Sequence, residues 1–289
     1  MDFLIDIFLD ALIDSIKLLP FLFITYLIME YIEHKTNKKV ENMVKKSGKY
    51  GPLAGAILGI FPQCGFSAAA SNLYANKLIS IGTLIAIFLS TSDEMLPIFI
   101  SESIEIGIIL KILAIKLIVA AFFGFLIDFI LNKKNRPISL NSGEEISHMC
   151  KHEHCGCENG IILSSLKHTL NIFIYIFVIT LLLNGLFEII GKDNISNFIA
   201  SVPILGPVVA GIIGLIPNCA SSVILTQLYL SGGITVSTLI SGLLVGSGVG
   251  ILVLFKFNKP MKDNFKILVL LYFIGVSVGI FLELIHLTI

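Results

Sequence analysis

Two cysteines stand at matching places in the chain, each as the last residue of a Pro-x-Cys triplet. The triplets are Pro62-Gln63-Cys64 and Pro217-Asn218-Cys219. Thiolates bind soft ions such as zinc, cadmium, copper(I) or trivalent arsenic, whereas manganese prefers oxygen ligands. A single cysteine at a tight turn is more often a small hydrophobe that fills space, but a matched pair beside matched prolines favours binding. We therefore expect the triplets, with the matched Ser67 and Ser222, to line a transport site.

A run of polar residues interrupts the apolar stretch 79–100. The run is Ser90, Thr91, Ser92, Asp93 and Glu94. Ionisable side chains inside a membrane span are costly and usually functional, as cation ligands or proton carriers. We expect Asp93 and Glu94 to couple transport to an ion. A structural ion pair with Lys111 or Lys116 is the alternative.

The central polar stretch concentrates possible metal ligands. Six of them lie within ten residues: His148, Cys150, His152, His154, Cys155 and Cys157. Four such groups would satisfy zinc or a similar ion, and an ordinary polar linker is the alternative. We expect this tract to sense or deliver metal in the cytoplasm, where thiols stay reduced, and not to form the transport path. No other cofactor is indicated.

The elements that carry these residues are membrane spans. Hydrophobic residues make up 55% of the chain and charged residues 14%, unlike a soluble domain. The net charge is zero, and no basic excess indicates a nucleic-acid partner. A bilayer partner is indicated instead, because eight apolar windows are long enough to cross one as helices, at 15–33, 51–75, 79–100, 108–131, 166–190, 205–229, 232–255 and 267–288.

The two halves of the chain match each other at a constant offset of 155 residues. Apolar filler would not repeat prolines, cysteines and tyrosines in register, so the sequence predicts an internal duplication. At this offset the run Gly246-Ser247-Gly248-Val249-Gly250 stands where the first half has Asp93 and Glu94, and Ser247 joins the candidate site. Other matches are Gly51-Pro52 with Gly206-Pro207 and Leu73-Tyr74 with Leu228-Tyr229.

Each Pro-x-Cys triplet interrupts an apolar window near its middle. Proline lacks an amide hydrogen and disfavours helical conformation in the residue before it, so we expect the first helix to stop at Phe61. Residues 51–61 then rise about 16 Å, roughly half of a hydrocarbon core. Beyond the break the chain can either continue across the membrane or turn back as a re-entrant hairpin.

The placement of basic residues favours the hairpin. They gather in segments 34–50, 132–168 and 256–266, and short cytoplasmic loops hold the basic residues of membrane proteins. Hairpins would place all three segments on one side and the acidic turn 102–105 on the other, whereas full crossings would separate the segments. Three full spans per half then insert the second half upside down.

We therefore predict an all-α integral membrane protein, an inverted repeat of two halves, each with three full spans plus one Pro-broken re-entrant hairpin. It would lie in the plasma membrane with both termini outside and the basic loops in the cytoplasm. The predicted regions are a first membrane repeat at 1–131 (hairpin 51–78), a cytoplasmic His/Cys-rich loop at 132–165, and a second membrane repeat at 166–289 (hairpin 205–231).

The chain resembles the ten-helix heavy-metal exporter family, whose members are also called arsenic efflux proteins or manganese transporters. The resemblance implies export of a heavy-metal or metalloid ion, arsenic or a divalent metal such as manganese. Six full spans plus four half-helices would supply the ten helices. The resemblance covers nearly the whole chain and rests on Gly51-Pro52, Pro62 to Ser67, Pro217 to Ser222, Leu228-Tyr229 and His154 to Cys157.

A transporter of another class is the alternative, an ion-coupled carrier of a small organic or inorganic anion bound at half-helix N-termini. An intramembrane enzyme using Asp93 would need a second catalytic group, and no matching motif is present, so we expect no enzymatic activity. No nucleotide-binding loop is present either, so transport would use a gradient of an ion such as the proton or sodium, or a separate ATPase subunit. The substrate, the direction of transport and the choice between monomer and homodimer stay open.

Overall fold

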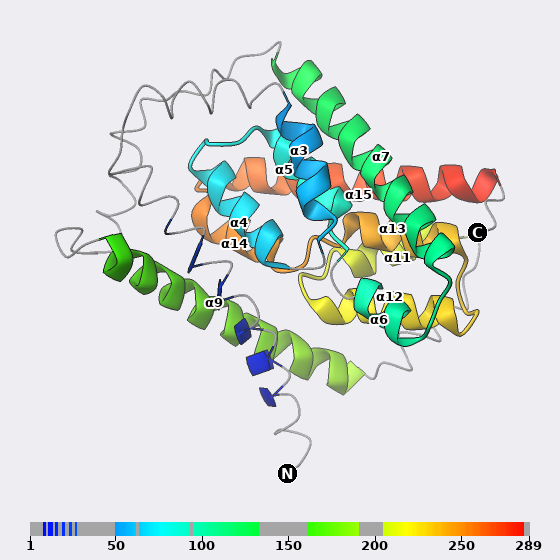
Figure 1. The fold of residues 1–289 in the computed structure, drawn as a ribbon, viewed down its shortest axis with the longest axis horizontal. Coiled ribbons are helices and arrows are strands. Elements are labelled where there is room, and N and C mark those ends of the chain that lie inside the picture. Colours follow the sequence, from blue (N-terminus) through cyan, green and yellow to red (C-terminus); the bar gives the residue numbers. More distant parts are fainter. Residues whose placement is uncertain are drawn as a thin grey trace.

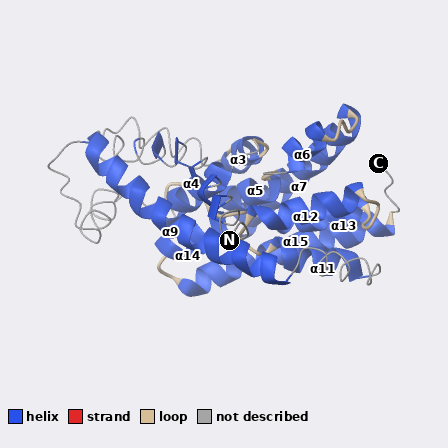
Figure 2. Ribbon diagram, turned by 90° about the horizontal axis from the view of Figure 1, so that it is seen from below, coloured by secondary structure: helices blue, strands red, loops and turns tan. Residues whose placement is uncertain are grey.

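The computed structural model describes residues 50–61, 64–92, 95–132, 161–190 and 205–285, together with scattered positions between Phe8 and Leu27. Regular structure in this part of the chain is helical, and it contains no strand (Figure 2). The predicted all-helical class is confirmed for these residues.

Short helices dominate both halves. The first half contains α3 (Gly51–Gly59), α4 (Cys64–Ala75), α5 (Ile81–Ser90), α6 (Met95–Ser101) and α7 (Ile106–Asn132). The second half contains α9 (Ile161–Ile190), α11 (Gly206–Gly214), α12 (Cys219–Leu230), α13 (Val236–Val245), α14 (Gly250–Phe257) and α15 (Met261–Leu284). Four residues separate α3 from α4, α5 from α6, α11 from α12 and α13 from α14.

Glycines allow α3 and α5 to run side by side in the same direction (Figure 1). A Cβ atom added at Gly51, the first residue of α3, would collide with Thr83 near the start of α5. A Cβ atom added at Gly59, the last residue of α3, would collide with Ser90 at the end of α5. The two helices therefore start together and end together.

The long helix α7 runs in the opposite direction to α5. Asp128, near the end of α7, accepts hydrogen bonds from Ser80 Oγ at 2.6 Å and from the backbone N–H of Gly82 at 2.9 Å, both at the start of α5. The first N–H groups of a helix have no partner within the helix, so the Asp128 carboxyl group satisfies one of them.

The second half makes the same contacts at the offset of 155 residues. A Cβ atom added at Gly206 would lie 2.5 Å from Thr238 Oγ1, so α11 starts beside the start of α13 as α3 does beside α5. Thr235 Oγ1 donates to Glu283 Oε2 at 2.8 Å, so α15 ends where α13 begins. Packing therefore repeats where residue types are similar and not identical, as in Ser80 and Thr235 or Asp128 and Glu283.

Short helices from each half pack against the other half. Helix α4 lies along α14 (Figure 1), where Ser71 Oγ donates to the carbonyl oxygen of Gly250 at 2.6 Å. Helix α6 packs against α12, and the rings of Phe99 and Tyr229 lie 5.9 Å apart. Both rings belong to the last turn of their helices, so α6 and α12 end side by side.

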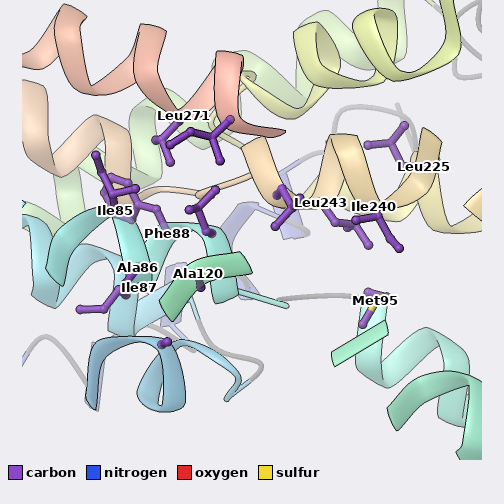
Figure 3. Packing of buried hydrophobic residues seen from close by; sticks show 14 of the residues in the cluster. Ile85, Ala86, Ile87, Phe88, Met95, Ala120, Leu225, Ile240, Leu243 and Leu271 are labelled. Atoms are coloured by element: carbon purple, nitrogen blue, oxygen red, sulfur yellow. The ribbon is translucent and has the colours of Figure 1, made fainter. Parts of the chain in front are cut away.

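The interrupted helices form the interior and the continuous ones the periphery. Five stretches of the described residues are long and apolar enough to cross a membrane. In the most apolar 18 residues of each stretch, 83% are buried in Val236–Phe257 and 75% in Ile81–Ser101, whereas only 22% are buried in Ile106–Leu131. Figure 3 shows this core, in which Phe88 from α5, Leu243 from α13 and Leu271 from α15 belong to one apolar cluster.

Replacing Asp128 by alanine should destabilise the protein, because two hydrogen bonds at the start of α5 are lost. Each is worth about 0.5–1.5 kcal/mol, or more if the carboxyl group is charged. The matched Glu283→Ala should cost less, since one hydrogen bond is lost at an exposed site. Glu102→Ala, in an exposed turn, is the control. Thermal unfolding of the three purified variants measures the order, and an Asp128→Ala variant as stable as the control would contradict this account.

Candidate functional site

Two helix breaks lie where the Pro-x-Cys triplets predict them. Helix α3 ends at Gly59, two residues before the predicted Phe61, and α4 begins at Cys64, while α11 ends at Gly214 and α12 begins at Cys219. Asn218 takes an extended conformation, with φ −144° and ψ 150°, immediately before α12. Each triplet thus separates two half-length helices.

Two further breaks divide apolar windows for which no helix break was predicted. The stretches Ile81–Ser101 and Val236–Phe257 keep span length, 21 and 22 residues, but break midway. In the first, the hydroxyl of Thr91 donates to the carbonyl oxygen of Ile87 at 2.7 Å, and such bonds compete with continuation of the helix. In the second, Gly248 has a φ of 54°, which glycine adopts without strain.

The four breaks lie close to one another. Each half brings its own two breaks together, because the ends of α3 and α5 touch and the ends of α11 and α13 touch. The starts of α4 and α14 then join one half to the other. The contacts at the glycine positions are Gly59 with Ser90, Gly214 with Val245 and Gly250 with Ser67.

Cys219 faces this junction. Its half-buried side chain packs against a buried cluster that combines α4, α9, α14 and the break before α14, namely Ala68, Ile176, Val253 and Val249. The preceding Asn218 is 2% exposed and Pro217 is half-buried. Cys64 begins α4, but its side chain is outside the described part, so the expected meeting of the two thiols stays a prediction.

Most of the predicted hydroxyl groups donate to backbone carbonyl oxygens two to four residues earlier in the chain. Ser222 Oγ donates to the carbonyl oxygen of Cys219 at 2.8 Å, and Ser92 Oγ donates to that of Ser90 at 3.1 Å. Ser247 is 1% exposed, and its Oγ has no hydrogen-bond partner among the described residues. A buried hydroxyl group left without a partner costs about 1–3 kcal/mol, and Ser247 Oγ therefore remains a candidate ligand group.

Several predicted site residues lie outside the described residues. They are Pro62, Gln63, Asp93, Glu94 and the six candidates of the central loop, His148, Cys150, His152, His154, Cys155 and Cys157. Within the described ranges, no three histidine, cysteine, aspartate or glutamate side chains are grouped to hold a metal ion. Metal binding by the loop and coupling by the carboxylates therefore stay predictions.

Lys116 is a central residue that was predicted only as an alternative partner for the carboxylates. It is fully buried, and its Nζ donates to the carbonyl oxygens of Thr91 and, at 2.9 Å, of Leu243. Lys111, the other candidate partner, is exposed on α7. The sequence does contain a signal for Lys116. It is a lysine inside an apolar span, at a position where the second half has Leu271.

Comparison with known proteins adds a family assignment. The family model described as "Putative, 10TM heavy-metal exporter" matches residues 3–187, which is more than half of the chain. No curated protein and no solved structure is similar enough to match. The apolar helices agree with a multi-pass membrane protein. The chain belongs to this family of ten-span heavy-metal exporters.

Proposed function

We propose that the protein is a secondary transporter that exports a heavy-metal or metalloid ion through a site between its four helix breaks. The observation that carries the proposal is the meeting of breaks from both halves through Gly59, Gly214 and Gly250. Non-helical backbone at membrane depth is tolerated only where it is buried in protein or lines a wet cavity. Secondary transporters bind their substrates at such junctions of broken helices.

The ligand groups of the proposed site come from the breaks and from the helix ends beside them. Cys219 and Cys64 supply thiols for a soft ion such as trivalent arsenic. Ser247 adds a buried hydroxyl group that has no partner among the described residues, and Asn218 adds an amide. The carboxylates of Asp93 and Glu94, also members of the proposed site, suit manganese better than the thiols do. The further members are Pro62, Gln63, Pro217, Ser67, Ser222, Ser90, Thr91 and Ser92.

The packing supports re-entrant hairpins. Because α3 and α5 start together, the chain between Gly59 and Ile81 must return to the end of the bundle from which α3 came. Helix α4 therefore leads back toward that end, and a complete crossing would leave the start of α5 on the far side. The same argument holds for α11, α12 and α13 in the second half.

Opposite orientations of the two halves are supported by the contact between Phe99 and Tyr229. Helix α7 follows α6 and runs back about 40 Å to the start of α5, since each residue rises about 1.5 Å. The end of α6 is therefore far from the start of α5. The end of α12 lies beside the end of α6, and α12 leads directly into α13. The starts of α5 and α13 then lie at opposite ends, as in an inverted repeat.

The charges of the turns suggest which end faces the cytoplasm. Lys77 lies between α4 and α5, and Lys259 lies between α14 and α15. Glu102 and Glu105 lie between α6 and α7. Because cytoplasmic loops carry an excess of basic residues, the end with Lys77 and Lys259 would face the cytoplasm. Both termini would then lie outside, and the membrane would be the plasma membrane. The His/Cys-rich loop would then bind a zinc-like ion in the cytoplasm.

Export can be tested in a metal-sensitive host by measuring survival and cell-associated arsenite, manganese, zinc and cadmium. We expect the wild-type chain to protect against at least one ion. Cys219→Ser should lower the tolerated concentration of a thiol-bound ion at least about tenfold, since even outer-shell partners of a metal are worth that much. Ser247→Ala should lower it less, because a neutral oxygen ligand is lost.

Ser231→Ala, in an exposed turn, is the control and should protect as the wild type does. Equal expression of the variants is checked by immunoblot. Unchanged content for every ion would contradict metal export. It would favour the second candidate, a carrier of a small anion, which the neighbouring N-termini of α4, α12 and α14 would suit.

A further inference from the structure

Lys116 satisfies backbone groups that the helix breaks leave without partners. The last carbonyl groups of a helix have no N–H partner within that helix. Thr91 follows the last residue of α5, and Leu243 lies in the last turn of α13. Their carbonyl oxygens, one from each half of the chain, both accept a hydrogen bond from Lys116 Nζ.

The surroundings of Lys116 Nζ are those of a cation site. The C-terminal end of a helix carries partial negative charge, equivalent to roughly half an elementary charge in a regular helix, and stabilises a cation placed there. Free coupling cations in carriers are held by unwound backbone carbonyl groups and half-helix C-termini. The compact ammonium group of lysine has the charge of a monovalent cation and carries three donors.

Only the first half has a lysine at this position. The residue corresponding to Lys116 at the offset of 155 is Leu271, which is also fully buried. A packing role alone would be met by leucine at both positions. Because α5 and α13 belong to different halves, the position of the Lys116 ammonium depends on how the two halves lie relative to each other.

We propose that the carbonyl oxygens of Thr91 and Leu243 form a monovalent-cation site and that the ammonium group of Lys116 is its built-in occupant. The inference rests on the proposed transport function, where the tethered ammonium takes the place of a free coupling ion such as sodium. No free cation is needed at this position in the wild-type chain. Removal of the lysine side chain converts the position into a site for a free sodium, potassium or ammonium ion.

Thermal unfolding of the full-length purified protein in lipid nanodiscs tests the proposal without a transport substrate. The variants are Lys116→Ala, which opens the site, and Lys116→Met, which fills it without charge. In N-methylglucamine chloride, Lys116→Ala should unfold roughly 5 °C or more below the wild type, since hydrogen bonds to two buried carbonyl oxygens are lost. Sodium, potassium or ammonium chloride at equal ionic strength should restore much of this difference in a saturable manner.

The wild type and Lys111→Ala, which removes an exposed lysine five positions away on α7, should show no difference between these salts. Lys116→Met should unfold early in all of them. If Lys116→Ala is too unstable to purify in N-methylglucamine, purification in ammonium chloride should recover it. The proposal is overturned if Lys116→Ala unfolds at the same temperature in every salt or is recovered in none of them. It is also overturned if Lys111→Ala responds to the salts as Lys116→Ala does. Metal export is measured separately, so its failure would leave a positive cation response intact.

Discussion

A cysteine added in each of four turns, one variant at a time, should be labelled from one side of the membrane in two variants and from the other side in the other two. We expect a membrane-impermeant maleimide to label Ser103→Cys and Ser231→Cys in intact cells, and to label Lys77→Cys and Lys259→Cys only after permeabilisation. All four positions are exposed at the ends of helices. The expected pairing follows from the adjacent starts of α3 and α5 and from the Phe99–Tyr229 contact.

The corresponding positions of the two halves make this test decisive. Lys77 and Ser231 lie one residue apart at the offset of 155, so halves with the same orientation would label both from one side. Labelling of the unsubstituted chain, which has five cysteines of its own, is the background to subtract. Labelling of Lys77→Cys and Ser231→Cys from the same face would contradict the inverted repeat, and labelling of all four only after permeabilisation would do so as well.

Contacts repeat between the halves at more positions than those where the two halves have identical residues. Gly51 and Gly206 were recognised as a pair from sequence, and they make equivalent contacts with Thr83 and Thr238. The match also reaches Asp128 and Glu283, which differ in type and were not paired from sequence. A hydrogen bond to a hydroxyl group needs only a carboxyl oxygen in reach, so geometry can repeat where identity does not.

The second pair of breaks was missed because hydropathy is averaged over a whole span. Residues 91–94 or 246–249 still leave the mean over about 20 residues in the range of a membrane span, so both stretches were interpreted as continuous. The serine and threonine run of the first half and the glycine run of the second were the visible signals. Both compete with helical hydrogen bonding. The serine and threonine hydroxyl groups donate to backbone carbonyl oxygens, and the glycines give the backbone conformational freedom.

The exchange of short helices between the halves and the backbone acceptors of Lys116 had no signature in a single sequence. Which helix α4 meets depends on how the whole bundle packs, and α4 resembles an apolar helix that could lie against any neighbour. The acceptors of Lys116 are backbone carbonyl groups, which every residue has. Only a three-dimensional arrangement distinguishes Thr91 and Leu243 from the rest.

Replacing Gly250 by valine should be among the most damaging single substitutions in the chain. A Cβ atom there would lie 2.8 Å from the Cβ of Ser67 and 2.9 Å from the ring of Phe88. Overpacking costs about 1–3 kcal/mol, and displacement of α4 would also remove the 2.6 Å hydrogen bond from Ser71, worth about 1 kcal/mol. We expect a large fall in Tm and loss of transport, because this contact joins α4 of one half to α14 of the other.

A double-mutant cycle separates this contact from the general effect of a side chain at a helix start. Gly107→Val, where an added Cβ would meet nothing within 4 Å, should leave Tm nearly unchanged. Gly250→Ala should be destabilising, and adding Ser67→Gly, which removes the nearest Cβ, should recover part of the loss although Phe88 still crowds the site. Residues in direct contact show coupling energies of about 0.5–3 kcal/mol. Additive effects of Gly250→Ala and Ser67→Gly would mean that α4 and α14 do not meet at this point, and the shared junction of the four breaks would lose its strongest link between the halves.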